Sequence, residues 1–348
     1  MGKLEVGVGI WSMQSTKFGP RHFSYLYNEL MEDAQYCDEL QTIKTIWQTE
    51  HHFWYDGYSP ALLTVAGGIA AATKHIQIGQ STMLFSQHEA LRVATQAAVV
   101  DQISGGRLQL GLGLGYRDNE FDGFNIDRRT RKARFEEGIE VLRASWADSP
   151  VNFHGKQFDI PDVSVTPKPF QPEIPIWVAA VGDAPIKRAA KLGLSIILSD
   201  ALTLDQLSEH IELYHKTADE YGVDTSKAKM GVLRRGWVAE TDDDAYQNAL
   251  KSLRFLLRDQ LGGWRYLKDE NGESVGFDTP DKLDAAAAKL VTVHERTIGR
   301  PEKVTRGLRE IAATGCDHII FGTRFDSLPR EKYLRSLELL ATEVIPNI

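Results

Sequence analysis

Two patterns of apolar residues alternate along the chain. Short runs rich in β-branched and aromatic residues predict strands. Longer stretches repeat apolar residues at three- and four-residue spacing, which predicts helices with one buried face. The strand pattern occurs at 4–11, 42–49, 76–84, 107–115, 176–180, 194–198, 230–239 and 318–322. The helical pattern occurs at 25–40, 60–74, 89–103, 129–146, 184–192, 204–221, 302–313 and 330–344, with one further helix after the acidic turn 241–244.

Individual positions refine these helices. In the helix at 25–40, the residues Leu26, Leu30, Ala34 and Cys37 share one face, which we expect to be buried. The helix at 60–74 is expected to begin with Ser59 as its N-cap and Pro60 as its first residue.

The alternation predicts one architecture for the whole chain. Strands that alternate with helices pair in parallel through right-handed crossovers. Eight such units in 348 residues favour a closed (β/α)8 barrel, the TIM barrel, over an open doubly wound sheet, which stays the alternative. Two insertions interrupt the pattern, a hairpin around Gly155 within 151–175 and a charged, irregular stretch at 259–298. We therefore expect a single barrel domain over residues 1–348.

The predicted barrel determines where ligands bind, because ligand-contacting groups in this fold come from the carboxyl ends of the strands. His51 and His52 stand at such an end, before a loop rich in aromatic residues. Other groups expected at this rim are Trp11, Ser81–Thr82, Tyr116–Arg117, Val181–Gly182–Asp183, Asp200 and Arg324. The predicted substrate pocket comprises Trp11, His52, Trp54, Tyr58, His88 and Arg324.

The adjacent histidines admit two interpretations. Imidazole changes charge near neutral pH, which suits it to proton transfer. Alternatively, one histidine is a satisfied structural group and the other is solvated. If the strand continues through His51 and His52, their side chains point to opposite faces and do not chelate together. Because the histidines also lack metal-ligand spacing with supporting carboxylates, no metal site is predicted.

Composition narrows the class of function. The chain is 42% hydrophobic and 25% charged, as globular proteins are, and its net charge of −8 disfavours nucleic acid and anionic membranes as partners. Cys37 and Cys316 lie far apart and outside any ligand spacing, so no disulfide framework is expected. No signal-peptide core or membrane-spanning run is apparent. We expect a cytoplasmic protein that acts on a small molecule.

Alternating glycines mark the strand at 107–115. Gly111, Gly113 and Gly115 suggest a dinucleotide fingerprint. That fingerprint needs a glycine three residues after Gly113, at the start of a helix, and Tyr116 stands at that position. A stripe without side chains could accept a flat ring, or it could relieve crowding inside the barrel. Both interpretations stay open.

Two further segments suggest binding surfaces. The loop Val181–Gly182–Asp183–Ala184 leads into a helix N-terminus that could hold an anion such as phosphate, or it is an ordinary turn with Asp183 as N-cap. The helix at 60–73 is apolar nearly all round, so we expect a second subunit to cover it in a homodimer. Burial by the chain's own loops is the alternative.

Several segments together resemble the bacterial luciferase family of flavin-dependent monooxygenases. They are Glu50-His51-His52-Phe53, residues 101–111, residues 188–193 and the tail 299–318, and the likeness extends over essentially the whole chain. The resemblance implies a reduced FMN at the barrel mouth, supplied by a separate flavin reductase. It also implies that this FMN reacts with O₂ to give a C4a-peroxide that oxygenates a small or medium organic substrate.

The resemblance also assigns residues. His51 matches the family's active-site histidine, and 259–298 matches its variable lid. Implied cofactor-binding residues are Ser81 and Thr82 at a non-proline cis peptide, Gly111 and Gly113 beside the ring, Tyr116 and Arg117 after the fourth strand, and Val181, Gly182, Asp183 and Ala184 at the phosphate.

Two departures leave the cofactor open. Leu114 stands where luciferase has a phosphate-binding arginine, with Arg117 as the nearest substitute, and Gly182 stands where luciferase has a serine. One alternative is therefore a coenzyme F420-dependent oxidoreductase that transfers a hydride on the same fold. Another is a non-catalytic flavin-binding barrel.

Overall fold

Eight parallel strands form a closed barrel in the spatial order β1-β12-β9-β8-β7-β4-β3-β2, which confirms the predicted (β/α)8 fold. The computed structural model describes residues 4–9, 14–15, 20–262, 277, 279–323 and 328–348. The barrel strands are β1 (Glu5–Gly9), β2 (Thr45–Gln48), β3 (Gln77–Gln80), β4 (Leu108–Leu112), β7 (Ile176–Ala180), β8 (Ser195–Leu198), β9 (Met230–Arg235) and β12 (His318–Gly322).

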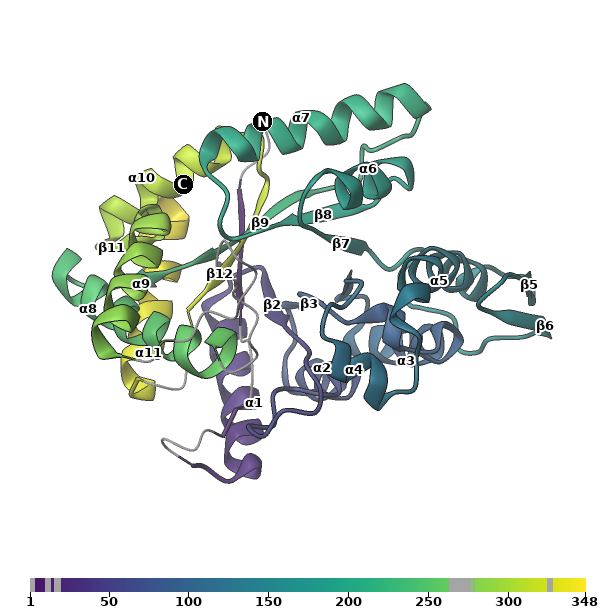
Figure 1. Cartoon of the computed structure of the whole chain (residues 1–348), viewed down its shortest axis with the longest axis horizontal. Helices are drawn as coiled ribbons and strands as arrows, with labels where there is room; N and C mark the ends of the chain where they lie inside the picture. Colours follow the sequence, from purple (N-terminus) through teal and green to yellow (C-terminus); the bar gives the residue numbers. More distant parts are fainter. Residues whose placement is uncertain (1–3, 10–13, 16–19, 263–276, 278, 324–327) are drawn as a thin grey trace. The chain divides into compact units, whose positions relative to one another are not determined.

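Helices connect the strands, as Figure 1 shows. They are α1 (Phe23–Leu40), α2 (Leu62–Ala72), α3 (Ala90–Ser104), α4 (Asp118–Gly123), α5 (Arg131–Trp146), α6 (Asp183–Lys191), α7 (Leu204–Tyr221), α8 (Asp242–Phe255), α9 (Pro280–Val293), α10 (Pro301–Ala312) and α11 (Arg330–Leu339). The predicted inner face of α1 is buried at all four expected positions. Of the helices that the structure describes, none is both long enough and apolar enough to traverse a bilayer.

Contacts within the chain define two compact units, and each is described by itself. The N-terminal unit contains 10–197 and 213–229, and the C-terminal unit contains 1–9, 198–212 and 230–348. The expected single domain stays a prediction.

The N-terminal unit is built on β2, β3, β4 and β7. Trp47 on β2 lies in register with Gly79 on β3, and its ring occupies the space beside that glycine, where a Cβ atom would lie 2.4 Å away. Trp47 also meets Trp177 of β7 edge to face, with 5.4 Å between the ring centroids. One face of these strands is therefore closed by large aromatic rings.

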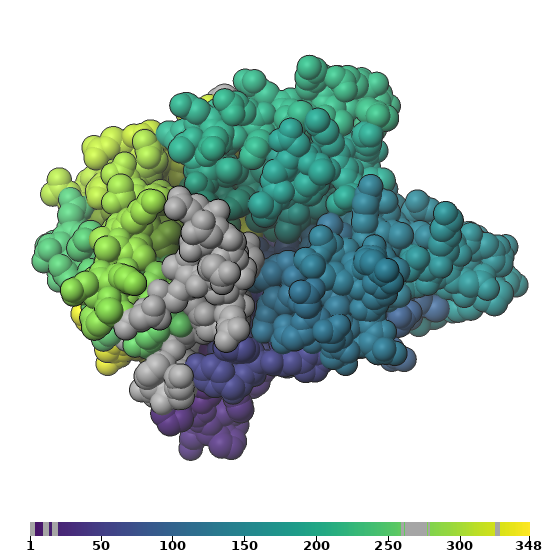
Figure 2. Space-filling view, in the orientation of Figure 1, coloured from purple at the N-terminus to yellow at the C-terminus, as the bar shows by residue number. Residues whose placement is uncertain are grey.

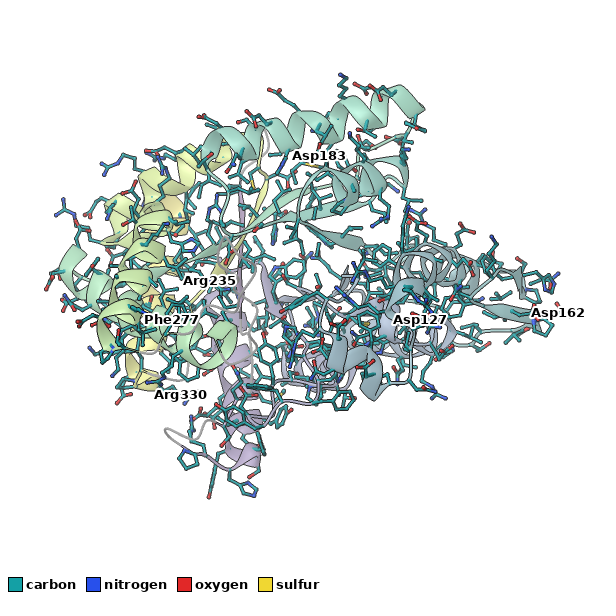
Figure 3. All side chains as sticks on the ribbon, in the orientation of Figure 1. Asp127, Asp162, Asp183, Arg235, Phe277 and Arg330 are labelled. Atoms are coloured by element: carbon teal, nitrogen blue, oxygen red, sulfur yellow. The ribbon has the colours of Figure 1, made fainter. Side chains whose placement is uncertain are left out.

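A hairpin extends from this unit beside α5. As predicted, β5 (Val151–His154) and β6 (Asp159–Val163) pair antiparallel around Gly155, whose N–H donates to the Phe158 carbonyl. The hairpin forms the projecting end of this part of the chain in Figures 1 and 2. Figure 3 labels Asp162, which lies on β6 near the end of the hairpin opposite its turn.

In the C-terminal unit, the single strand predicted at 230–239 was wrong. Strand β9 ends at Arg235, and β10 (Trp237–Val238) instead pairs with β11 (Ile298–Gly299) in a separate two-stranded sheet. The break falls at Gly236, where a Cβ atom would lie 2.2 Å from the Phe321 ring. Close packing of that ring against the backbone accounts for the glycine.

The prediction of an irregular stretch at 259–298 was also wrong in part. Residues Pro280–Val293 form α9, capped by the Thr279 side chain, which accepts from the Lys282 N–H. Alanines at 285–288 give this segment helical propensity despite its charge. The predicted lid residues 263–276 and 278 lie outside the described residues.

Element ends differ at three further places. Helix α2 begins at Leu62 after Ala61, so the predicted Ser59 N-cap is wrong; the Ser59 carbonyl instead accepts from the His51 N–H. Gly182 rather than Asp183 precedes the first turn of α6. The strands predicted at 76–84 and 107–115 end early, at Gln80 and Leu112, although an isolated bridge joins Met83 to Leu112.

Candidate functional site

A buried hydrogen-bond network surrounds His51, just beyond the carboxyl end of β2. The His51 Nδ1 atom lies 2.8 Å from Glu120 Oε1, and the same oxygen accepts from the His52 backbone N–H at 3.0 Å. Arg117 Nη1 also donates to it, at 3.1 Å. Because an ionised carboxylate only accepts hydrogen bonds, Nδ1 of His51 must carry a proton. The other ring nitrogen, Nε2, faces the Tyr116 hydroxyl at 3.3 Å.

Electrostatics keep Glu120 ionised. Burial favours its neutral form, but the hydrogen bond from His51 and the charge of Arg117 outweigh burial and lower the pKa of Glu120. The guanidinium of Arg117 is itself buried and lies 5.5 Å from the centroid of the Trp54 ring. A fixed anion therefore orients the His51 imidazole from one side.

Aromatic residues enclose the other side of His51. Tyr58 meets the imidazole edge to face at 4.9 Å between centroids, and Tyr116 does so at 5.6 Å. The loop that carries Tyr58 is held by Asp56, which accepts from the Tyr58 N–H at 3.0 Å and contacts the Gln14 amide. The imidazole thus combines a fixed orientation with an apolar wall.

A second cluster lies next to the first and comprises Glu50, His52 and His88, hereafter the Glu50 cluster. Glu50 accepts from the Leu84 N–H at 2.6 Å, and His88 Nε2 lies 3.1 Å from both of its oxygens. His52 Nε2 approaches Glu50 Oε1 to 3.3 Å. Burial of Glu50 opposes its ionisation, but the two histidines outweigh burial and lower its pKa to about 2.

The Glu50 cluster also has the composition of a metal site. Its three ligand atoms lie within 4.8 Å of one another, and two imidazoles with one carboxylate form a set that binds divalent metals in other proteins. The sequence analysis found no carboxylate to support the histidines, whereas the folded chain places one beside them. Glu50 supplies the carboxylate, and His88 enters from the next repeat of the barrel.

The predicted cofactor residues occupy distinct places. The Ser81–Thr82 peptide bond is cis, as the resemblance implies. Gly111 and Gly113 are explained by packing, because a Cβ on Gly111 would lie 1.7 Å from the Gln80 carbonyl oxygen and one on Gly113 would lie 2.7 Å from Thr82 Oγ1. The structure thus favours relief of crowding as the reason for the glycine stripe.

The phosphate loop is different. Gly182 has a φ of 82°, in the region that favours glycine, and a Cβ there would meet nothing within 4 Å. Val181 is exposed, and Asp183, labelled in Figure 3, starts α6. An open backbone loop at a helix N-terminus is suited to a phosphate group.

Observed contacts thus unite part of the predicted site. His51, His52, Trp54, Tyr58, Tyr116 and Arg117 gather around Glu120, whereas His88 belongs to the Glu50 cluster. Arg117 binds Glu120 and the His52 carbonyl, and its role at the phosphate stays a prediction. Trp11 and Arg324 lie outside the described residues.

Sequence analysis missed Glu120. It lies on α4, which is only six residues long and was not predicted. A usable signal was present, because Arg117 and Glu120 are three residues apart after a predicted strand end, a spacing that allows contact on a helical turn.

Two polar atoms near His51 are left unsatisfied by the part of the chain that the structure describes. Among the described residues, Glu120 Oε2 and Trp54 Nε1 are buried and have no hydrogen-bond partner. One can accept and the other can donate, which matches a flat heterocycle with both kinds of group along its edge. Such a donor and acceptor are compatible with the edge of a flavin.

A closed eight-stranded barrel with an oriented histidine after its second strand defines a (β/α)8-barrel protein with a candidate active site. The comparison with protein families narrows this class. The model of the luciferase-like monooxygenases matches residues 12–318, so the chain belongs to that family. The resemblance found in the sequence is thereby confirmed, and membership supports an oxidoreductase of the monooxygenase type.

Three relatives share only 20–26% of their aligned residues with this chain. The oxygenase component of flavin-dependent trigonelline monooxygenase from Acinetobacter baylyi is 26% identical over 329 residues, covering 92% of this chain and 89% of that protein. The FMN complex of the oxygenating constituent of 3,6-diketocamphane monooxygenase from Pseudomonas putida superposes with a TM-score of 0.80 at 20% identity, covering 100% and 99% of the chains. An F420-dependent secondary alcohol dehydrogenase gives 0.76 at 21% identity, covering 99% of each.

Proposed function

We propose that the chain is the oxygenase of a two-component monooxygenase that uses reduced FMN and O₂ to oxygenate a small or medium organic substrate. The observation that carries this proposal is the pair of His51 and Glu120, in which a buried carboxylate fixes the imidazole through Nδ1. The name of the Acinetobacter relative, an oxygenase component, supports the dependence on a separate flavin reductase.

In this proposal His51 is the catalytic residue. Glu120 accepts a hydrogen bond from Nδ1–H of His51. The Nε2 atom therefore keeps its lone pair and can take a proton from the ligand or from the Tyr116 hydroxyl. When His51 is protonated at both nitrogens, the anionic Glu120 stabilises the resulting cation. The residue can thus take up a proton and return it without moving.

Reduced flavin, when bound, supplies the electrons and the reactivity toward O₂. The protein's contribution is to bind, orient and exclude water. Tyr58 and Tyr116 form the apolar wall beside His51, while Trp54 Nε1 and Glu120 Oε2 offer one donor and one acceptor. The 181–184 loop would hold the phosphate through backbone N–H groups.

A titration distinguishes reduced FMN from the alternative cofactor. We expect protein mixed anaerobically with reduced FMN, and separately with reduced F420, to bind FMN at one equivalent. Admitting O₂ to the FMN sample should then change the rate at which the flavin is reoxidised. Tight binding of F420 alone, with no effect on FMN reoxidation, would replace this proposal with the hydride-transfer function.

We also propose that the chain forms a homodimer through α2 and α3. A cavity of about 360 Å³ lies on their surface, lined by apolar residues that include Leu63, Gly67 and Ile103. Val99 and Ile103 are exposed there, at 43% and 52%. A second copy would remove this apolar surface from water.

Sedimentation velocity tests the dimer. We expect wild-type protein to sediment as a dimer and Ile103→Glu to sediment as a monomer, because a charge would be buried at the interface. Ile126→Glu, a half-buried position outside this cavity, is the control. A monomeric wild-type protein would contradict the proposal.

A further inference from the structure

A cavity in the C-terminal unit has no role in the site described above. Its volume is about 430 Å³, enough for a small organic molecule. It is lined by the 201–203 loop, the start of α7, Arg234, the end of α9 and the segment 294–297. All of these residues belong to the same compact unit. The composition of the lining indicates which ligand it accepts.

Positive charge gathers on one side of the cavity. Arg234 is 5% exposed and donates to the Asp200 carbonyl at 2.6 Å and to the Leu202 carbonyl at 2.5 Å. Backbone carbonyls orient this guanidinium, and the charge of Asp200 also acts on it. Arg296 is a second cation in the lining and pairs with Glu310 and, at 3.6 Å, with Glu295. Arg235, labelled in Figure 3, is nearby but pairs with Asp200.

His294 is the least satisfied polar group in the lining. It is 2% exposed, and its Nδ1 atom has no hydrogen-bond partner among the described residues. Burial lowers its pKa to about 3, and Arg235 and Arg234 add to that effect while Asp200 opposes it. An unpaired polar atom of this kind costs about 1–3 kcal/mol unless something binds it.

The helix α7 adds to the positive end. Thr203, Leu204 and Asp205 line the cavity at the N-terminus of this 18-residue helix, where the helix dipole favours an anion. The carboxylate of Asp205 repels an anion, but water screens its charge because the residue is exposed. Leu202, Leu204 and the 39% exposed Val293 add apolar surface, and Thr292 and Thr297 complete the lining.

We propose that this cavity binds an organic anion, a carboxylate with an apolar body. The carboxylate faces Arg234, Arg296 and His294, and the apolar body lies against Leu202 and Val293. This binding does not depend on the proposed oxygenase function.

Calorimetric titration with matched probes tests the site. Benzoate, phenylacetate and hexanoate are compared with benzamide, phenylacetamide and hexanamide, and with inorganic phosphate. We expect at least one acid to bind the wild-type protein at one equivalent, about 10-fold or more tightly than its amide. Arg296→Gln should weaken that acid about 10-fold. Arg300→Gln, an exposed arginine outside the cavity, should change it less than two-fold.

Each contrary result overturns the proposal. These are no binding of any acid, equal affinity for acid and amide, equal effects of the two arginine substitutions, or binding of phosphate alone. A long-range proton–nitrogen spectrum should also show the His294 ring nitrogens shifting when the acid binds. FMN binding is measured separately by flavin absorbance. Acid binding without FMN binding would refute the oxygenase assignment and leave the cavity site intact.

Discussion

His51 and His294 are both buried histidines, yet their surroundings differ in one decisive respect. The Nδ1 atom of His51 is held by an anionic carboxylate at 2.8 Å. The same atom of His294 is buried without a partner among the described residues, and the residue lines a cavity together with Arg234 and Arg296. The first imidazole is fixed in orientation by its own chain. The second is left unsatisfied by the described part of its own chain. Burial alone therefore does not reveal what a histidine does.

The largest effect is expected at Glu120. Glu120→Gln removes the charge that three donors share and breaks the ion pair that Glu120 forms with the buried Arg117. We expect unfolding free energy to fall by about 3–5 kcal/mol, the usual cost of breaking a buried ion pair. Chemical denaturation measures it. Asp118→Asn on the same helix is the control, and its side chain is 75% exposed. Equal losses for both would mean that His51 is not held by Glu120's charge.

A slightly smaller effect is expected in the Glu50 cluster, and it depends on pH. The pKa of Glu50 falls from 4.5 to about 2, so its contribution to stability is present above pH 4.5 and is lost as the pH falls toward 2. The pKa of His88 is raised above 6.5, so its contribution is present below pH 6.5 and is lost as the pH rises through the higher folded value.

Glu50→Gln should therefore destabilise the protein most between pH 4.5 and 6.5. The expected loss is about 3 kcal/mol, since one pKa unit corresponds to about 1.4 kcal/mol. Denaturation of both proteins across pH 2–9 provides the comparison. A difference independent of pH would show that the carboxylate is not paired with the histidines.

The smallest effect is expected at His294. Its Nδ1 gains nothing from the fold and costs about 1–3 kcal/mol when unsatisfied, so His294→Leu should not lower the unfolding free energy. It should nevertheless weaken binding of the organic acid. If this substitution instead destabilised the protein by 3 kcal/mol or more, the imidazole would be structural and the contrast with His51 would fail.

Regular features of the fold could be predicted from the sequence, and close contacts could not. Apolar periodicity located every barrel strand and the buried face of α1, because burial leaves a repeating trace in the sequence. Strand β9 was extended too far because the space occupied by Phe321 against Gly236 depends on a residue 85 positions away. No local pattern reports such a contact.

The candidate site divides in the same way. The strand-end position singled out the His51–His52 pair, and the family resemblance pointed to His51. Its partner Glu120 was missed because a six-residue helix has too few turns for a periodic pattern. The Glu50 cluster was missed because Glu50 and His88 meet only when neighbouring repeats of the barrel pack together. The cavity beside His294 depends likewise on segments around 201, 234 and 294 that meet only in the folded chain.

Stopped-flow reoxidation of reduced FMN tests the central claim, that His51 takes part in flavin chemistry. Reduced FMN bound to wild-type protein is mixed with O₂, and its absorbance is compared with that of free reduced FMN. The same experiment uses His51→Ala and, as a control, His154→Ala on the exposed hairpin. We predict a changed rate with wild-type protein and His154→Ala, and a return toward the free-flavin rate with His51→Ala. Identical traces for wild type and His51→Ala, with FMN bound in both, would contradict the account.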